Sequence, residues 1–261
     1  MKKTQISLVS IALWYRLRVW RYFLIVFSYS WVLWSLAIFN GTPIDDFSTG
    51  ILYILGGLGP TIGWIICNNI DEKKGTVETI LKAIKFDTLG FKGLTVTACL
   101  ATLPMFLSWS LVGEGATLDF TVVSSIAPIA MLTVVSVIEE TGWRGYAYPQ
   151  LNQIHSPIVS SLIVGLLWSL WHLPLTMIKG TYQYDLGYWT PEFFLFFFLM
   201  IPNSLVYGWL FKYTNQNVAS SVLYHTLMNL TGEVFGFTGN SDIFRTVVIT
   251  ILAILLGLKM V

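Results

Sequence analysis

Polar groups occur in three short patterns within a chain that is otherwise dominated by apolar residues. Glu-Glu-Thr-Gly-Trp-Arg spans 139–144, Trp-Ser-Leu-Trp-His spans 168–172 and His-Thr-Leu-Met-Asn spans 225–229. Ionisable groups cost free energy in lipid, so they persist mainly where they pair, line a wet cavity or take part in chemistry. Two carboxylates, two imidazoles, an amide and a guanidinium are the functional groups of a hydrolase. The candidate site residues are therefore Glu139, Glu140, Arg144, His172, His225 and Asn229.

The spacing within the first and third patterns predicts which side chains share a helix face. Glu140 and Arg144 are four residues apart and lie on one face, while Glu139 points about 100° away. We therefore expect Glu140 and Arg144 to form a charge-balanced brace, which leaves Glu139 to face another helix. His225 and Asn229 are also four residues apart and present a common polar face.

The composition is that of an integral membrane protein. Hydrophobic residues make up 55% of the chain and charged residues only 11%, against about 25% charged in ordinary soluble domains. The formal net charge of +1 indicates neither nucleic acid nor an acidic substrate as partner. Cys67 and Cys99 both lie in apolar segments, which favours buried thiols over a disulfide framework.

The hydropathy pattern predicts an all-α, polytopic membrane protein with about eight transmembrane helices. Spanning a ~30 Å hydrocarbon core takes roughly 20 apolar residues. No linker or internal repeat divides the chain, so residues 1–261 are expected to form one domain, with residues 1–20 as an interfacial segment. The predicted spans lie near 21–41, 49–69, 92–112, 120–147, 157–178, 192–212, 217–237 and 243–261.

The distribution of positive charge predicts a cytoplasmic N-terminus. In that orientation, cytoplasmic segments hold thirteen of the fifteen Lys and Arg residues, and only Lys179 and Arg245 lie outside. Such a bias follows the positive-inside rule. The segment 70–91 is expected to be a cytoplasmic amphipathic piece, and a prokaryotic host would place the protein in the plasma membrane.

The three patterns are expected to meet inside the membrane. At a rise of ~1.5 Å per residue, Glu139, His172 and His225 lie roughly 15, 22 and 15 Å from the cytoplasmic ends of their helices. Pro174 cannot donate to the carbonyl of Leu170, which predicts an irregular backbone just after His172. The substrate entrance is expected on the cytoplasmic side.

The order Glu-Glu-x-x-x-Arg, aromatic-x-x-x-His, His-x-x-x-Asn on successive membrane helices resembles the CPBP family, also called Abi. This family groups type II CAAX prenyl proteases with bacteriocin-processing and bacteriocin-immunity proteins. The similarity covers roughly residues 120–237, and Trp168 stands where Phe is more usual, an aromatic-for-aromatic difference that does not weaken the resemblance. The resemblance implies an intramembrane endopeptidase that acts on a membrane-associated peptide, prenylated or of a bacteriocin or signal type.

The resemblance also implies a role for each site residue. Glu139 would be the general base that activates water, and His172 would hold or polarise that water. His225 and Asn229 would stabilise the oxyanion. No cofactor is required by this scheme, and the expected partners are membrane lipid and a peptide or protein substrate. The oligomeric state is left open.

Three alternatives use the same residues differently. In a zinc-dependent metalloprotease, Glu139, His172 and His225 would be ligands and Glu140 the base, although the usual His-Glu-x-x-His helix is absent. A non-proteolytic immunity factor or scaffold would keep the fold without turnover. A transporter would show repeat symmetry, which this chain lacks, and would not require the face formed by His225 and Asn229.

Overall fold

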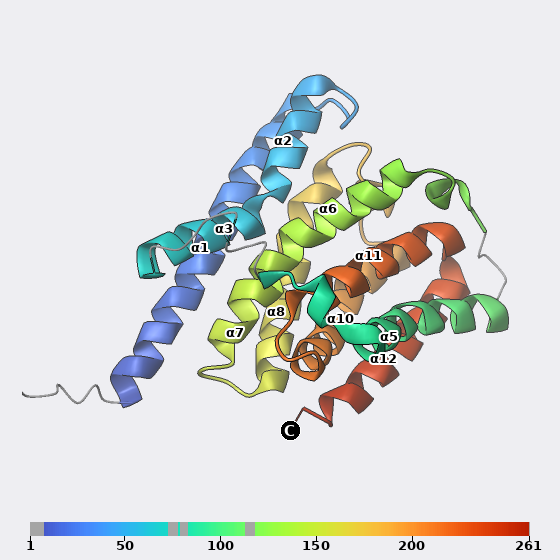
Figure 1. Cartoon of the computed structure of the whole chain (residues 1–261). Coiled ribbons are helices and arrows are strands. Elements are labelled where there is room, and N and C mark those ends of the chain that lie inside the picture. The colour runs from blue at the N-terminus through green and yellow to red at the C-terminus, as the bar shows by residue number, and fades with distance from the viewer. Residues whose placement is uncertain (1–7, 73–77, 79–82, 113–117, 261) are drawn as a thin grey trace, which may run out of the picture.

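The computed structural model describes residues 8–72, 78, 83–112 and 118–260, and all regular structure within them is helical. Figure 1 shows the arrangement of the helices. The long elements are α1 (Leu8–Asn40), α2 (Phe47–Gly57), α3 (Gly59–Glu72), α5 (Gly90–Leu111), α6 (Ile126–Gly142), α8 (Pro157–Trp171), α10 (Pro191–Tyr213), α11 (Val218–Phe235) and α12 (Gly239–Gly257). Short helical turns connect them: η1 (Phe86–Thr88), η2 (Thr121–Val123), η3 (Trp143–Ala147), α7 (Tyr148–Leu151), η4 (Leu173–Met177) and α9 (Tyr182–Asp185).

Local sequence signals begin several of these helices. Asp46 caps α2 by accepting hydrogen bonds from the backbone N–H groups of Ser48 and Thr49. The Ser48 hydroxyl and these N–H groups hold the pKa of the Asp46 carboxyl below its usual value. Ser156 and Thr190 cap α8 and α10, and each is followed by a proline at the first helical position. Such caps satisfy N–H groups that have no partner within the helix.

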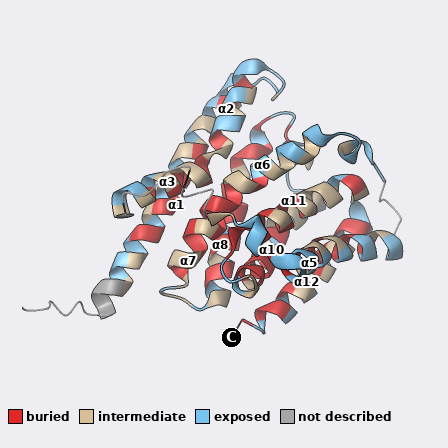
Figure 2. Ribbon diagram, in the orientation of Figure 1, coloured by how far each residue is buried: buried red, intermediate tan, exposed pale blue. Residues whose placement is uncertain are grey.

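The helices form one bundle with two flanking groups. The α8, α10 and α11 helices pack in the interior with α6, while α1, α2 and α3 lie along one side and α5 and α12 along the other (Figure 1). Buried residues concentrate where α6, α8, α10 and α11 approach one another, and the outer faces of α1, α2 and α5 are exposed (Figure 2). The exposed faces carry large apolar side chains, as expected for surfaces that contact lipid.

The number of apolar spans is smaller than the eight expected from hydropathy. Within the described residues, six helices are long and apolar enough to cross a membrane, or seven if α2 and α3, which are bent by 46°, form one broken span. The predicted span 217–237 is a helix, α11, but it is too polar to count among them. The hydropathy of α11 is low because its apolar residues alternate with polar ones, which are serines, threonines, His225, Asn229 and Glu233.

The first predicted span belongs to a longer helix. Residues 21–40 continue directly from Leu8 in α1, so residues 8–20 are not a separate helix. Residues 1–7 lie outside the described residues, as does much of the predicted amphipathic segment 70–91. Neither cysteine is in a disulfide; Cys67 is buried as expected, whereas Cys99 is exposed, because it lies on the outer face of α5.

Contacts between connecting segments agree with the predicted alternation of sides. Lys179 Nζ donates to Gly41 O at 3.0 Å, and both residues were predicted to lie outside. Asn217 Nδ2 donates to Lys85 O at 2.7 Å, and both were predicted to lie inside. Lys212 Nζ likewise reaches Met260 O at 3.1 Å. Each contact therefore joins two segments that were predicted to lie on the same side of the membrane. Which side is cytoplasmic stays a prediction.

Glycines permit close approach where the helices that carry the site cross. A Cβ on Gly165 of α8 would lie 2.8 Å from Ser204 Cβ and 2.9 Å from Ile201 Cα of α10. A Cβ on Gly142, at the end of α6, would lie 2.5 Å from Pro60 O of α3. Small residues of this kind are typical of tightly packed membrane helices. They bring the backbones of α6 and α8 close enough to their neighbours for short polar side chains to meet.

Candidate active site

The first polar pattern lies at the end of α6, where the helix changes its winding. Glu139 and Glu140 are both buried, and the helix continues from Trp143 to Ala147 as a π-helical turn. The N–H of Trp143 is directed at the carbonyls of both Glu139 and Glu140. Single π turns within α-helices often mark functional sites.

Glu140 connects the first pattern to the third. Its Oε1 accepts a hydrogen bond from Arg144 Nη1 at 3.1 Å and lies 2.9 Å from His225 Nδ1. The predicted pair of Glu140 and Arg144 is therefore present, and both side chains are almost completely buried. The contact with His225 was not predicted. Glu140 Oε2 is buried without a hydrogen-bond partner among the described residues.

Arg144 is held by more than its carboxylate. Its Nη2 donates to Ser204 Oγ at 3.3 Å, and its guanidinium carbon lies 3.8 Å from the ring centroid of Tyr207 and 4.8 Å from that of Trp168. Ser204 and Tyr207 both belong to α10, which carries no recognised pattern. The sequence did not single them out, because a serine and a tyrosine in an apolar helix are common. Cation–π contacts become stronger when the cation is removed from water.

Glu139 faces α8, as its position on α6 predicted. Its Oε2 accepts a hydrogen bond from the indole N–H of Trp168 at 2.7 Å. Within the described part of the chain, Glu139 accepts no other side-chain hydrogen bond. A tryptophan stands here where phenylalanine is more usual in the family that the sequence resembles, and it adds a hydrogen-bond donor. Only the indole ring carries an N–H that can reach the carboxylate.

His172 lies at the C-terminal end of α8. The helix ends at Trp171, and the 3₁₀ turn η4 follows from Leu173, so the irregular backbone expected near Pro174 is present. His172 Nδ1 lies 2.9 Å from the carbonyl oxygen of Trp168. A carbonyl can only accept, so Nδ1 carries the hydrogen and Nε2 of the neutral ring is left as an acceptor.

Asn229 lies one helical turn beyond His225 on α11 and is half-buried. It makes no side-chain hydrogen bond in the part of the chain that the structure describes. The rings of His172 and His225 both flank Trp168, with centroid separations of 5.9 and 5.5 Å. The structure thus gathers five of the six predicted residues into one buried cluster (the polar cluster: Glu139, Glu140, Arg144, His172 and His225) and places Asn229 at its edge.

Asn203 of α10 lies outside the three polar patterns. In the structure its Oδ1 accepts a hydrogen bond from Tyr224 Oη at 2.9 Å. This bond joins α10 to α11 one residue before His225. Asn203 therefore helps to fix α11 against the bundle and does not enter the polar cluster.

Residues 121–231, which include the polar cluster and Asn229, match a family described as Type II CAAX prenyl endopeptidase Rce1-like. The chain is also 28% identical over 249 residues to "CAAX prenyl protease 2" of Methanococcus maripaludis, covering 89% of this chain and 90% of that protein. The chain belongs to the type II CAAX prenyl endopeptidase family. The predicted resemblance is thereby confirmed, and membership of a family of proteases identifies the chain as an enzyme. These matches do not support a role in bacteriocin immunity.

The zinc alternative for this endopeptidase was tested against the arrangement of ligands. Among the described residues, no three His, Cys, Asp or Glu side chains are grouped so that they could hold a metal ion. Glu139 Oε2 is already engaged by Trp168, and His225 Nδ1 by Glu140. Glu139 Oε1 and the Nε2 atoms of both histidines make no such contact among the described residues, so the zinc alternative stays a prediction that chelation can test.

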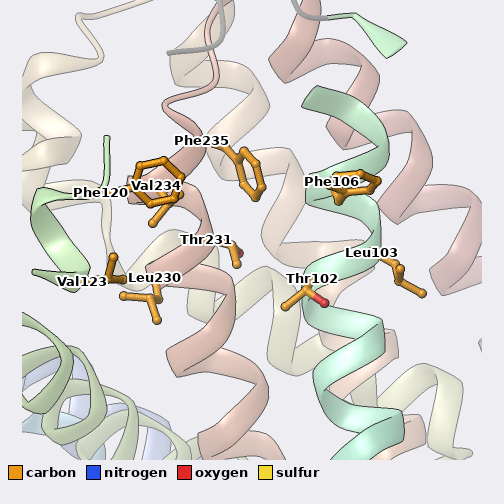
Figure 3. A pocket seen from close by; sticks show the side chains of 9 residues that line it. All are labelled: Thr102, Leu103, Phe106, Phe120, Val123, Leu230, Thr231, Val234 and Phe235. Atoms are coloured by element: carbon orange, nitrogen blue, oxygen red, sulfur yellow. The ribbon is translucent and has the colours of Figure 1, made fainter. Parts of the chain in front are cut away.

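An apolar groove shares one helix, α11, with the candidate site. The groove has a volume of about 460 Å³ and lies between α5, η2 and α11 (Figure 3). Its walls include Phe106 of α5, Phe120 before η2, and Leu230 and Val234 of α11. Leu230 directly follows Asn229 on α11, so the groove and the third polar pattern share this helix.

Proposed function

We propose that this chain is an intramembrane endopeptidase that hydrolyses a peptide bond of a membrane-associated peptide through a water molecule activated by Glu139. The observation that carries the proposal is the placement of Glu139. It is buried and faces the histidine-bearing helix α8, and among the described residues only its Oε2 is engaged in a hydrogen bond. Oε1 is therefore left to take a proton from water. Nε2 of His172, which can accept a hydrogen bond, would hold the same water.

The chemical step follows from these groups. Glu139 takes a proton from the water, and the resulting hydroxide attacks the carbonyl carbon of the scissile peptide bond. The carbonyl oxygen becomes an oxyanion in the tetrahedral intermediate. When the C–N bond breaks, the proton held by Glu139 passes to the leaving amine, which restores the carboxylate for the next turnover.

His225 and Asn229 are proposed to stabilise the oxyanion. The Asn229 amide can donate a hydrogen bond directly. His225 directs Nδ1 at the Glu140 carboxylate, so it offers an N–H at Nε2 only when both ring nitrogens carry hydrogen. Glu140 then compensates the positive charge of that imidazolium, as an orienting carboxylate does in other hydrolases. Arg144 supports Glu140 in this role and braces the end of α6.

The substrate is proposed to be a prenylated peptide. The family description and the name of the methanogen relative both refer to CAAX prenyl substrates, in which the Cys of the C-terminal Cys-aliphatic-aliphatic-X sequence carries an isoprenyl chain. The groove between α5 and α11 supports this, because it is apolar and is lined by α11, the helix that carries His225 and Asn229. We place the isoprenyl chain in the groove and the peptide across the polar cluster.

The orientation proposed for the enzyme has a cytoplasmic N-terminus and a cytoplasmic entrance. The charge bias supports it, since only Lys179 and Arg245 fall on the opposite side. Accessibility of single cysteines introduced at Lys85 and Lys179 in intact cells would test this directly. Reaction of the residue at 179 alone with an impermeant reagent supports the orientation, and reaction of the residue at 85 alone reverses it.

Proteolysis is tested with the purified protein in proteoliposomes. A farnesylated peptide ending in Cys-aliphatic-aliphatic-X is added, and mass spectrometry locates the cleaved bond. Wild-type protein should cleave the peptide, and Glu139→Gln should not, because the amide keeps the shape of the side chain but cannot take a proton. Cleavage by Glu139→Gln at the wild-type rate would contradict the mechanism.

The groove is tested with a matched pair of threonines on α5. Thr102 lines the groove and Thr95 is exposed, and each donates its hydroxyl to the carbonyl four residues earlier at 2.9 Å. Thr102→Trp should fill the groove and raise KM for the farnesylated peptide about tenfold or more, whereas Thr95→Trp should leave KM unchanged. Equal KM values for the two variants would remove the groove from substrate binding.

A further inference from the structure

Trp168 contacts both members of the proposed water-activating pair. Its indole N–H donates to Glu139 Oε2 at 2.7 Å, and its carbonyl oxygen accepts from His172 Nδ1 at 2.9 Å. Glu139 belongs to α6 and His172 to the end of α8, so these two contacts join groups from different helices. Both bonds come from one residue. They engage Glu139 Oε2 and His172 Nδ1, and the proposed reaction uses the other atom of each group, Oε1 and Nε2.

The surroundings of Trp168 fix its ring. It is 6% exposed and packs edge-on against Tyr207 and His225, with centroid separations of 5.7 and 5.5 Å. The Arg144 guanidinium lies over its face. A ring confined on several sides cannot change rotamer without displacing its neighbours. The position of the indole N–H is therefore set by the packing of α6, α8, α10 and α11 together.

We propose that Trp168 is a positioning residue that sets the geometry between Glu139 and His172. Its side chain engages Oε2 and so presents Oε1 of Glu139 to the water, while its carbonyl engages Nδ1 and so presents Nε2 of His172 to the same water. This inference rests on the proposed function and deepens it. The pair of hydrogen bonds explains why a tryptophan serves this position: an aromatic ring without a donor could pack there but could not hold the carboxylate.

The consequence for catalysis is specific. Without the indole N–H, the Glu139 carboxylate can rotate, and fewer of its conformations place Oε1 against the water. Turnover should fall, since small errors in the position of a catalytic group are costly. Substrate binding should not change, because Trp168 lies behind the catalytic groups and does not line the groove.

Trp171 offers a matched control on the same helix. It is 2% exposed and packs edge-on against His172, and its indole N–H is buried with no hydrogen-bond partner among the described residues. Trp168→Phe and Trp171→Phe thus each exchange a buried indole for a phenyl ring near His172. Only the first removes a hydrogen bond.

The experiment compares the two variants with wild type in proteoliposomes that contain the farnesylated peptide. Trp168→Phe should lower kcat about tenfold to a hundredfold, the range for a hydrogen bond to a charged group, with KM within about twofold. Trp171→Phe should keep kcat within about threefold. Thermal unfolding in detergent should be similar for both. Equal kcat values, or an effect of Trp168→Phe on KM alone, would overturn the proposal.

A second replacement separates the N–H from the shape of the ring. Site-specific incorporation of benzothienylalanine at 168 puts sulfur in place of the indole N–H and keeps the bicyclic ring. A loss of kcat similar to that of Trp168→Phe supports the positioning role, and wild-type kcat overturns it. Glu139→Gln is measured alongside. Its activity at the wild-type level would remove the proposed function itself, whereas an inactive Glu139→Gln with an unaffected benzothienylalanine protein overturns only this inference.

Discussion

Two buried groups of charged residues in this chain differ in how completely their carboxylates are satisfied. In the first (the Asp71 cluster: Arg18, Arg21, Asp71 and Tyr146), Asp71 Oδ1 contacts Arg21 Nη2 at 2.5 Å, while Oδ2 contacts Arg18 Nε at 2.8 Å and accepts from Tyr146 Oη at 3.1 Å. In the polar cluster, Glu140 Oε2 has no partner among the described residues, and Glu139 uses a single oxygen.

The difference indicates which cluster holds the structure together and which performs chemistry. Buried charges usually have their hydrogen-bonding capacity filled, because an unfilled one costs free energy. Asp71 follows this rule, since both of its oxygens are engaged, and it ties α1, α3 and the π turn η3 together. The polar cluster departs from the rule at Glu140 Oε2, and Glu139 Oε1 accepts no hydrogen bond from the described residues. We propose that this incomplete satisfaction, more than the presence of charge, marks the polar cluster as the active site.

The largest expected effect separates the two clusters by activity. Glu139→Gln should reduce peptide cleavage by about a thousandfold or more, since general-base catalysis typically contributes ~10²–10⁴-fold and Gln cannot take a proton. Asp71→Asn should keep kcat/KM within about threefold at a temperature where both proteins are folded. Cleavage assays with equal amounts of folded protein give both values. A large loss in Asp71→Asn alone would reverse the assignment of the two clusters.

Arg144→Ala tests the ion pair between Glu140 and Arg144 within the polar cluster. The change leaves Glu140 buried without its guanidinium, a loss of about 3–5 kcal/mol when such a pair is truly buried. We expect a lower unfolding temperature in detergent together with reduced activity. Arg245→Ala is the control, because Arg245 also pairs with a carboxylate within its own helix, but on α12, which carries no residue of the polar cluster. An inactive Arg144→Ala as stable as wild type would assign the arginine to chemistry or binding.

Asn229→Ala tests the edge of the polar cluster. If the amide donates to the oxyanion, its removal should lower kcat about a hundredfold or more, the usual range for one such donor. KM should change little, because the hydrogen bond strengthens only as charge develops on the carbonyl oxygen. Steady-state kinetics on the farnesylated peptide measure both constants. A rise in KM at constant kcat would make Asn229 a substrate-binding residue.

Chelation should have the smallest effect. The mechanism routes no step through a metal, so exhaustive treatment with a chelator is expected to leave the cleavage rate within about twofold of the untreated enzyme. Elemental analysis of the purified protein should find no stoichiometric transition metal. Loss of activity that added zinc restores, with about one zinc per chain, would instead make ligands of Glu139, His172 and His225.

The sequence was sufficient to predict much of the site because its spacing is local. A Glu and an Arg four residues apart on a helix must share a face, and the pair of Glu140 and Arg144 is present as predicted. The positions of the helices followed from runs of apolar residues in the same way. The sequence analysis counted α11 as an apolar span, which the structure does not support. The polar residues that α11 contributes to the candidate site lower its mean hydropathy, and spans are recognised by that quantity.

The contacts that give the site its geometry were not predictable. Glu140 meets His225 across 85 residues of chain, Trp168 meets Glu139 across 29, and Ser204 meets Arg144 across 60. Each depends on how α6, α8, α10 and α11 cross, and a single sequence contains no signal for a crossing between two helices. The Asp71 cluster was missed for the same reason, since its arginines resemble ordinary positive-inside residues.

The sequence by itself therefore determined an all-helical membrane chain, the family and the chemical groups of its site, because composition and spacing along a helix are local properties. Only the tertiary structure decided which oxygen of each glutamate is engaged, which nitrogen of each histidine carries the hydrogen, and that Trp168 contacts both catalytic groups. Those choices arise from packing between helices, where directional hydrogen bonds form only after the backbones have approached closely.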